Sequence, residues 1–434
     1  MQNEVGEFHV RFDARQGKCG QNVTRQEGKS KVSAVNFDMT QSSREAQAGG
    51  NARVMAVAPA KRVVVVASYA PSLTNFRLEL LRKMVECGHS VVALAPEDDP
   101  LVTAQLARIG VEFRQVPMAR AGFNPFEDLR TLWALWRNFR ALRPDVVIPY
   151  TMKPIIYGGI AARLAGVRHR SFLVTGLGHV FSEAAGKSLK GRAIRALSVA
   201  LYRRAFRGAD VVFAYNDADV DDIRRNRMLG DDRVLELVPG SGVDLQHFAY
   251  REPRQDKAVF LLIARLLKDK GVLDFVEAAR QLKPRFPTAE FRILGHFDPN
   301  PSAISRAQMD AWVKEGVVTY LGETRDVRPF LADCNVFVLP SYYREGIPRS
   351  ILEALSTGRA IITTDLPGCR DTVDDGGNGY LIPARDPRRL AEAMMHFAEN
   401  PGDAHVMGLR SREIAQTRFE VHALNRRLIQ RLGL

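Results

Sequence analysis

The chain has 434 residues, of which 46% are apolar and 26% are charged. This length predicts two globular domains rather than one core, and no apolar run is long enough to span a bilayer. The net charge is +13, and residues 61–245 hold 27 Lys and Arg against 19 Asp and Glu. Such an excess suits a nucleic acid, an anionic membrane surface or a diphosphate-linked acceptor.

Residues 1–60 are rich in Gln, Ser, Gly, Asn and Arg without a sustained apolar period, and are predicted to be a disordered extension. An alternative is a translation start at Met55. The first residues lack the basic-then-apolar pattern of a signal peptide, so we expect a cytoplasmic protein. The cysteines are far apart without metal-binding spacing and are expected to be reduced thiols: Cys19, Cys87, Cys334 and Cys369.

The first predicted domain, residues 61–245, alternates unbroken apolar strands with amphipathic helices. We predict strands at residues 62–68, 90–96, 111–117, 145–150, 171–176 and 210–216, and helices at 75–87 and 127–142. Strands that are apolar at every position are typical of parallel sheets covered on both faces. The pattern therefore predicts a doubly wound α/β domain.

A second domain of the same kind is predicted at residues 246–416, after a connection at 234–248. We predict its strands at residues 258–266, 291–295, 317–322, 336–340, 360–365 and 379–383. The predicted architecture is therefore two Rossmann-like domains that face each other across a cleft. A last helix is predicted at residues 418–432, within the C-terminal segment 417–434.

A strand, a loop and a helix follow one another between Val336 and Gly358. Pro348 is predicted at the first helical position, and Gly358 at the helix end. Glu345 then precedes the helix start, whose free amides and dipole attract an anion, and Glu353 lies more than one turn inside. The same pattern fits a helix whose Glu353 is merely solvated.

Two cations occupy the corresponding place after the first strand of the second domain. Arg265 ends that strand, and Lys270 precedes Gly271 at a turn into a helix. Ligands of open α/β sheets bind beyond the carboxyl ends of the strands. Two cations there can hold a diphosphate and stabilise it as a leaving group. The alternative is that both are solvated loop charges.

The string LPSYYREGIPRSILEAL, residues 339–355, resembles the signature of the retaining family 4 (group 1) glycosyltransferases. Within that family it looks most like the branch that builds capsules, exopolysaccharides and lipid-linked oligosaccharides. ARLLKDKG, residues 264–271, is similar to the family's diphosphate site, with Ala264 in place of a Gly. The resemblance implies the GT-B fold, in which the last helix crosses back to the first domain.

The resemblance also implies residue roles. Glu345 would lie beside the transferred sugar, and Glu353 would bind the ribose of the nucleotide. Arg265 and Lys270 would act on the diphosphate and, with Glu345, would form the catalytic set. The implied donor-binding set is Arg265, Lys270, Glu345, Gly346, Ile347 and Glu353.

On the acceptor side, residues 150–166 and 174–181 resemble the same branch. The candidate acceptor-binding residues are Asn75, Arg77, Lys153 and Thr175. Alternatively, Lys153 is a surface charge and the glycines after Thr175 only make a turn. Relatives often carry a His where this chain has Ile148 or Pro149, so the identity of any catalytic base is open, and His179 is no obvious substitute.

Several motifs of other enzyme classes are absent from the sequence. There is no G-x-G-x-x-G after a strand and no P-loop, so a dinucleotide cofactor is unsupported. Asp217-Ala218-Asp219 mimics the D-x-D metal site of other glycosyltransferases. It follows a strand directly, and Asp217 is better explained as a helix N-cap. We therefore expect no catalytic metal, and no cofactor besides the UDP-sugar donor.

Residues 186–207 hold seven Lys and Arg and no acid, with Ile194, Leu197, Leu201 and Ala205 on one predicted helical face. A basic amphipathic helix can lie in a membrane interface. The alternative is a helix packed on its own domain with a solvated basic face. The charge excess would still favour anionic lipid.

Taken with these features, the resemblance implies a metal-independent enzyme at the inner face of the cell membrane. It would move a sugar, an N-acetylhexosamine by this resemblance, from a UDP-sugar to a polyprenyl-diphosphate-linked saccharide during bacterial surface polysaccharide synthesis. No nucleic-acid partner is implied. Two alternatives are a nucleotide-sugar epimerase of the same fold and a non-catalytic partner in a polysaccharide-assembly complex.

Overall fold

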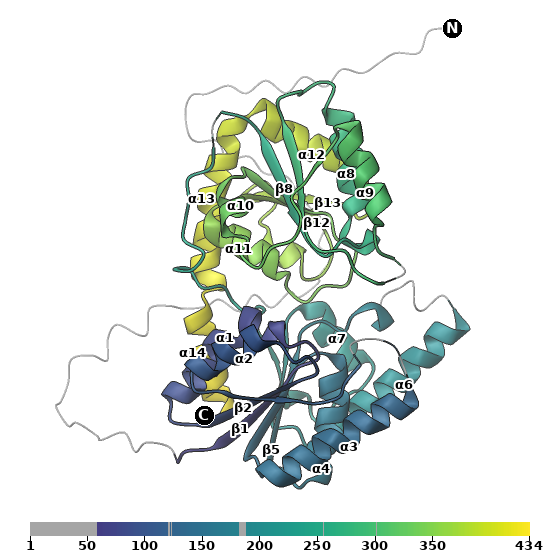
Figure 1. Cartoon of the computed structure of the whole chain (residues 1–434), viewed down its shortest axis with the longest axis vertical. Helices are drawn as coiled ribbons and strands as arrows, with labels where there is room; N and C mark the ends of the chain where they lie inside the picture. The colour runs from purple at the N-terminus through teal and green to yellow at the C-terminus, as the bar shows by residue number, and fades with distance from the viewer. Residues whose placement is uncertain (1–58, 120–121, 123, 182–187, 255, 301) are drawn as a thin grey trace, which may run out of the picture. The chain divides into compact units, whose positions relative to one another are not determined.

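The structure, a computed structural model, describes residues 59–119, 122, 124–181, 188–254, 256–300 and 302–434. All described elements belong to one compact unit, residues 58–434. The extension predicted at residues 1–60 lies outside the described residues except for its last two positions. Two parallel sheets with helices on their faces build the unit (Figure 1), which confirms the predicted α/β class.

The first sheet has the strand order β3-β2-β1-β4-β5-β6-β7, with every neighbouring pair parallel. Its strands are β1 (Arg62–Val66), β2 (Ser90–Ala95), β3 (Glu112–Gln115), β4 (Val146–Pro149), β5 (His169–Val174), β6 (Val211–Ala214) and β7 (Leu235–Leu237). The six predicted strands are all present. The seventh, β7, lies in the segment predicted only as a connection, and three residues are too few to show a period.

Helices cover both faces of this sheet. They are α1 (Pro71–Glu86), α2 (Pro100–Arg108), α3 (Pro125–Leu142), the π-helix η2 (Pro154–Gly158), α4 (Gly159–Leu164), α6 (Leu189–Phe206) and α7 (Asp217–Arg225). Val63 and Val65 pack on the side of α1, whereas Val64 and Val66 pack on the side of α3. Because successive side chains enter opposite cores, the strands are apolar at every position.

The second sheet has the order β10-β9-β8-β11-β12-β13, again parallel throughout. Its strands are β8 (Val259–Ile263), β9 (Glu290–Leu294), β10 (Thr319–Tyr320), β11 (Val336–Leu339), β12 (Ala360–Thr364) and β13 (Gly379–Ile382), so each predicted strand is present. Its helices are α8 (Val272–Leu282), α9 (Arg306–Glu315), α10 (Arg328–Ala332), α11 (Arg349–Thr357), α12 (Pro387–Glu399) and α13 (Pro401–Arg418).

The last helix, α14 (Val421–Leu432), packs on the first domain although it follows the second in sequence. Its buried side chains Leu424, Leu428 and Ile429 belong to the same apolar cluster as Val63 and Leu80 of the first domain. Figure 1 shows α14 beside α1, at the yellow end of the chain. Helix α14 therefore contributes to the first core, whereas Phe419, two residues before it, packs in the core of the second domain.

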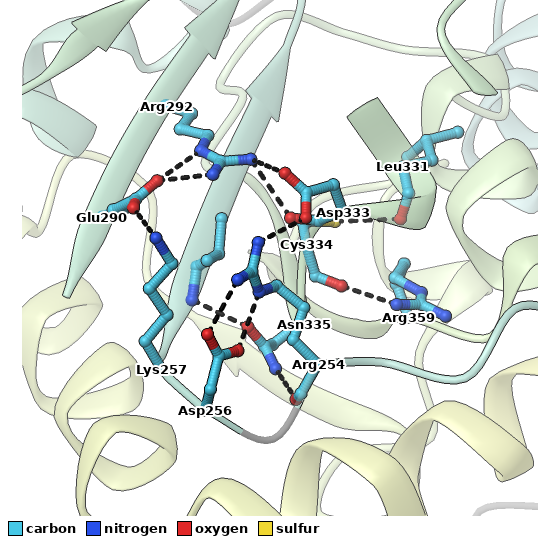
Figure 2. Close-up of polar contacts among 11 residues, drawn as sticks. Arg254, Asp256, Lys257, Glu290, Arg292, Leu331, Asp333, Cys334, Asn335 and Arg359 are labelled. Carbon is cyan, nitrogen blue, oxygen red and sulfur yellow. Dashed lines mark hydrogen bonds and ion pairs between the residues drawn. The ribbon is translucent and has the colours of Figure 1, made fainter. Parts of the chain in front are cut away.

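A network of ion pairs joins the amino ends of the strands of the second sheet (Figure 2). Asp333 accepts from Arg292 over 2.7 Å and from Arg254 over 2.6 Å. Glu290 accepts from Arg292 over 2.7 Å and pairs with Lys257. Because all strands are parallel, this network lies at the edge opposite to the loops that follow β8 and β11, and we assign it a structural role.

Two predicted helix starts need correction. Pro348 is the N-cap of α11, not its first helical residue, because its ψ of 119° is extended, and the helix begins at Arg349. Asp217 is the first residue of α7, and the cap is Asn216, whose side-chain oxygen accepts from the Asp219 amide over 2.8 Å. Both shifts are of one residue.

Helix α6 buries a face that only partly overlaps the predicted stripe, since Ala205 of that stripe is buried and Leu201 packs against the same apolar cluster. Its buried residues are Ser198, Val199, Tyr202, Ala205 and Phe206, whereas Leu197 of the predicted stripe is 53% exposed. The two aromatic side chains pack against the first sheet, where Phe206 contacts Phe172 edge to face. Aromatic bulk decides the buried face here, which leaves part of the aliphatic surface exposed.

Candidate active site

The carboxyl edge of the second sheet brings Lys270 and Glu345 together. Lys270 ends the short helix η5 (Lys268–Lys270) after β8, and Glu345 lies in the loop after β11. Gly271 has a φ of 75°, and a Cβ there would lie 2.1 Å from the Pro340 carbonyl oxygen, so only glycine allows the two loops to approach. The Lys270 ammonium donates to Glu345 Oε1, and both side chains are largely buried.

A hydroxyl and an aromatic ring complete this pair. Ser341 Oγ donates to the same oxygen, Glu345 Oε1, over 2.9 Å, and Ser341 is fully buried. The Tyr343 ring centre lies 5.1 Å from Lys270 Nζ. An ammonium and a hydroxyl on one oxygen set the orientation of the Glu345 carboxylate.

Arg265 is held by a different carboxylate. It follows β8 directly, and its Nη1 lies 3.0 Å from Asp298 Oδ2, in the loop after β9. Its side chain is 31% exposed, more than twice the 13% of Lys270. The two predicted cations thus occupy the same sheet edge, one covered and one partly open to solvent.

Glu353 lies on α11 and is not a solvated surface group. Its side chain is 14% exposed, and Arg349 Nε lies 3.0 Å from its Oε1. Burial raises the pKa of Glu353, and the charge of Arg349 opposes that shift. Arg349 also donates to the Gly242 carbonyl in the connection between the domains. Sequence reasoning missed Arg349, although its i,i+4 spacing to Glu353 was the available signal.

The loop that carries Glu345 presses against the first domain. A Cβ on Gly346 would lie 2.4 Å from the Thr175 carbonyl oxygen, and one on Gly176 would lie 3.0 Å from the Gly346 amide nitrogen. Ile347 is 9% exposed and belongs to an apolar cluster with Tyr215 of the first domain. The backbones of Gly346, a predicted donor-binding residue, and Thr175, a predicted acceptor-binding residue, are therefore in close contact.

Two polar residues at this contact were not singled out from the sequence. Asn216 Nδ2 lies 3.2 Å from the Glu345 carbonyl oxygen and 3.3 Å from that of Gly346. Arg344 pairs with Asp219 over 3.1 Å and with Asp222 over 2.5 Å. Contacts between residues more than 100 positions apart leave no local sequence pattern, so no signal could have paired them.

Among the acceptor-side candidates, Asn75 is exposed near the start of α1, and Arg77 is 3% exposed. The Arg77 guanidinium lies 5.0 Å from the Tyr150 ring centre and 5.5 Å from that of Tyr215, whose hydroxyl accepts a hydrogen bond from it. Arg77 Nε is buried without a hydrogen-bond partner among the described residues. A buried cation held by aromatic rings is a feature of ligand sites as well as of cores.

Lys153 is buried rather than a surface charge. Its ammonium lies 2.8 Å from Asp128 Oδ1 of α3, and the two side chains are 10% and 9% exposed. It immediately precedes the π-helix η2, a conformation frequently found at functional sites. The assignments of Asn75, Arg77, Lys153 and Thr175 to an acceptor stay predictions.

The positions without the family's His lie at the end of β4, where Ile148 is fully buried. Within the described part of the chain, no group of three or more His, Cys, Asp or Glu side chains is placed to hold a metal ion. Burial raises the pKa of the Cys334 and Cys369 thiols to about 12, in keeping with structural roles.

Comparison with known proteins identifies the family. Residues 74–240 match the family described as "Glycosyl transferase 4-like domain", and residues 257–400 match "Glycosyl transferases group 1". The two matches cover the second sheet, every strand of the first sheet except β1, and every residue of the Lys270–Glu345–Glu353 set. The chain is a group 1 glycosyltransferase. As a glycosyltransferase it is an enzyme, and its predicted GT-B fold is confirmed.

Two relatives and one solved structure illustrate the similarity. The chain is 28% identical over 352 residues to the N,N'-diacetylbacillosaminyl-diphospho-undecaprenol alpha-1,3-N-acetylgalactosaminyltransferase of Campylobacter jejuni, covering 78% of this chain and 90% of that one. It is 27% identical to the UDP-Gal:alpha-D-GlcNAc-diphosphoundecaprenol alpha-1,3-galactosyltransferase of Escherichia coli, covering 66% and 74%. Anabaena HepE in complex with UDP and glucose superposes with a TM-score of 0.68 at 16% identity, covering 86% and 99%, which shows the fold alone.

Proposed function

We propose that this glycosyltransferase moves a sugar, an N-acetylhexosamine or hexose, from a UDP-sugar to a polyprenyl-diphosphate-linked saccharide. The single observation that carries the proposal is the placement of Lys270, Glu345 and Glu353 at the carboxyl edge of the second sheet, with Arg265 beside them. The names of the two relatives, which specify diphospho-undecaprenol acceptors and alpha-1,3 transfer, support the substrate class.

Each side chain has a distinct task in this proposal. The bond between the sugar's anomeric carbon and the diphosphate breaks while an acceptor hydroxyl forms the new bond from the same face. The hydroxyl proton passes to the departing diphosphate, so no separate base is needed. Lys270 and Arg265 stabilise the charge that grows on the diphosphate. Lys270 would then exchange part of its contact with Glu345 for phosphate oxygens.

The two glutamates act on different parts of the donor. Glu345, oriented by Ser341 and Lys270, faces the sugar. Glu353 accepts from the ribose hydroxyls, and the charge of Arg349 favours the ionised carboxylate by opposing the rise in the Glu353 pKa that burial causes. Arg349 is thus a member of the donor site in this proposal.

Arg77 is the strongest acceptor-side group. It is a buried guanidinium whose contacts among the described residues are the Tyr150 and Tyr215 rings and the Tyr215 hydroxyl, with no carboxylate within ion-pair distance. An uncompensated buried cation is costly, and a diphosphate would offset that cost. We therefore assign the acceptor diphosphate to the end of the first sheet where Arg77, Tyr150 and Tyr215 meet.

The outer faces of α3 and α6 fit an anionic membrane surface, where the acceptor lipid resides. Both helices pack on η2, and both expose large apolar side chains. These are Phe126, Leu129, Trp133, Leu189 and Leu197, between 53% and 86% exposed. Exposed cations border them: Arg130, Arg137, Lys190, Arg192, Arg204 and Arg207. From these exposed apolar and basic side chains we propose a peripheral attachment at the inner face. None of the described helices is both long and apolar enough to cross a bilayer.

The decisive experiment is transfer by the purified full chain, with a panel of UDP-sugars and a short-chain polyprenyl-diphosphate-linked N-acetylhexosamine. Arg265→Ala should lower turnover more than it weakens UDP binding, because its contact strengthens as the leaving group departs. Glu353→Gln should raise the donor KM first. Glu345→Gln should affect both, mainly turnover. Exposed Arg388→Ala is the control.

Four results would contradict the proposal. The first is wild-type turnover in folded Glu345→Gln and Arg265→Ala. The second is conversion of the UDP-sugar into an epimer without any acceptor, which would favour the epimerase. A β-configured product by nuclear magnetic resonance would contradict retention. Absence of product with every donor would point to a non-catalytic partner.

A further inference from the structure

The two aspartates of the Asp217-Ala218-Asp219 motif, which resembles a metal site in sequence, lie in different environments in the fold. Asp217 begins α7 and is exposed, whereas Asp219 is fully buried. The two carboxylates therefore face different surroundings and do not act as one ligand pair. A buried carboxylate needs partners, and those of Asp219 come from both domains.

Asp219 joins three elements. Its Oδ1 accepts from the Leu177 amide over 3.3 Å, in the loop after β5, and from Arg344 Nη2 over 3.1 Å. Its Oδ2 accepts from Asn216 Nδ2 over 3.1 Å. Burial raises the pKa of Asp219, and the charge of Arg344 opposes that shift. The carboxylate thus links the loop on the acceptor side with the loop that carries Glu345.

Arg344 reaches from the second domain into the first. Besides Asp219, it contacts Asp222 Oδ2 at 2.5 Å and donates to the carbonyls of Phe181 over 2.9 Å and Ala218 over 3.1 Å. A planar guanidinium with several donors can satisfy such a set, and an ammonium cannot. The partners fix both the direction and the depth of the Arg344 side chain.

The residue that follows Arg344 is Glu345. Asn216, the cap of α7, donates to the carbonyls of both Glu345 and Gly346. The start of α7 and its cap therefore hold two neighbouring residues of the second domain. Asn216 binds the backbone of Glu345, and Asp219 and Asp222 bind the side chain of Arg344. Side chains of the second domain, Lys270 and Ser341, hold only the Glu345 carboxylate.

We propose that Asp219 and Arg344 form a latch between the two domains that places Glu345 opposite the Thr175–Gly178 loop. Both are positioning residues, since they act through Glu345 rather than on the substrates. The expected effect of the latch on sugar transfer rests on the proposed function. Its expected effect on the contact between the two domains does not, because that contact can be measured without any activity. In some proteins buried ion pairs specify an arrangement more than they stabilise a fold, and we assign that role to this pair.

The test compares Asp219→Asn, Arg344→Gln and their double variant in the full chain, with Asp217→Asn as the matched control in the same motif. Hydrogen–deuterium exchange is followed in peptides that contain residues 175–178 and 344–346. Turnover, acceptor KM and the UDP dissociation constant are measured alongside. Melting curves establish folding, and Arg344→Lys and Asp222→Asn replace any variant that does not fold.

Each latch variant should exchange faster in both peptides and lose about 100-fold in turnover, because a displacement near 1 Å can cost a factor of that size. UDP affinity should change by less than about threefold, because the donor side chains belong to the second domain. The double variant should be no worse than the worse single variant, since the two residues act as one unit. Asp217→Asn should match the wild type in every measurement.

Unchanged exchange in folded Asp219→Asn and Arg344→Gln would overturn the latch, as would additive losses in the double variant. Loss of activity in Asp217→Asn, restored by Mn²⁺ or Mg²⁺, would favour a metal site instead. If the wild type transfers no sugar, the proposed function fails, while the exchange measurements still decide whether the latch exists.

Discussion

Gly346→Ala tests the close contact between the domains without removing any polar group. Gly346 does not have a positive φ, so alanine adds no backbone strain there, and its only new atom is a Cβ 2.4 Å from the Thr175 carbonyl oxygen. Ordinary carbon–oxygen contacts are about 3.3–3.6 Å. The two loops must therefore move apart by about 1 Å.

A displacement of that size has a predictable result. Misplacement of a catalytic group by about 1 Å can lower the rate by about 100-fold, or about 2.7 kcal/mol in the barrier, and we expect a loss of that size here. The melting temperature should change little, because the loops separate rather than overpack a core. UDP affinity should also be retained if Gly346 contributes only backbone to the donor site.

The assay is steady-state transfer by Gly346→Ala, with calorimetric binding of UDP and the exchange measurement on residues 175–178. Gly230→Ala is the matched control, because a Cβ there meets no atom within 4 Å. Turnover within twofold of wild type, together with unchanged exchange, would refute the reasoning. It would mean that the contact between Gly346 and Thr175 is not part of the state in which transfer occurs.

Three further predictions follow from other parts of the molecule. The triple variant Arg192→Glu, Arg204→Glu and Arg207→Glu should release the protein from anionic vesicles at low salt. The same change at exposed Arg388, Arg426 and Arg427 is the control and should not release it. Arg203 is left intact because it donates to the Asn226 carbonyl over 2.6 Å. Transfer should persist in excess EDTA, since Arg265 and Lys270 supply the positive charge at the diphosphate, and complete loss restored by Mn²⁺ would contradict this. In the network at the amino ends of the second sheet, burial opposes ionisation of Glu290 and Asp333, but hydrogen bonds from Arg292 and its neighbours lower both pKa values. These two carboxylates therefore stabilise the fold at neutral pH, and this stabilisation is lost as the pH falls from the ordinary carboxyl pKa through the lowered value. Arg292→Met should make the free energy of unfolding less sensitive to acid in urea titrations. An unaltered pH dependence would be inconsistent with the network.

The sequence was sufficient for every strand of both sheets except β7, and for the residues at the edge of the second sheet. A parallel sheet that is covered on both faces requires unbroken apolar strands such as β1 and β11, so the local composition is enough to predict which segments are buried strands. The order of strand, loop and helix around Glu345 also follows locally, because turns and helix ends depend on neighbouring residues. The errors there were of one residue, at Pro348 and Asp217.

Only the tertiary structure decided what these residues touch. The sequence named Lys153 and Arg77 as candidate acceptor-binding residues but not their contacts. Packing buries Lys153 beside Asp128 and Arg77 beside the rings of Tyr150 and Tyr215. Asp219 looked like half of a metal motif and instead binds Arg344, 125 positions away. Local propensities cannot encode such partners, because the choice depends on which loops the packed sheets bring within hydrogen-bonding distance, and the cost of burying a charge then selects the pair.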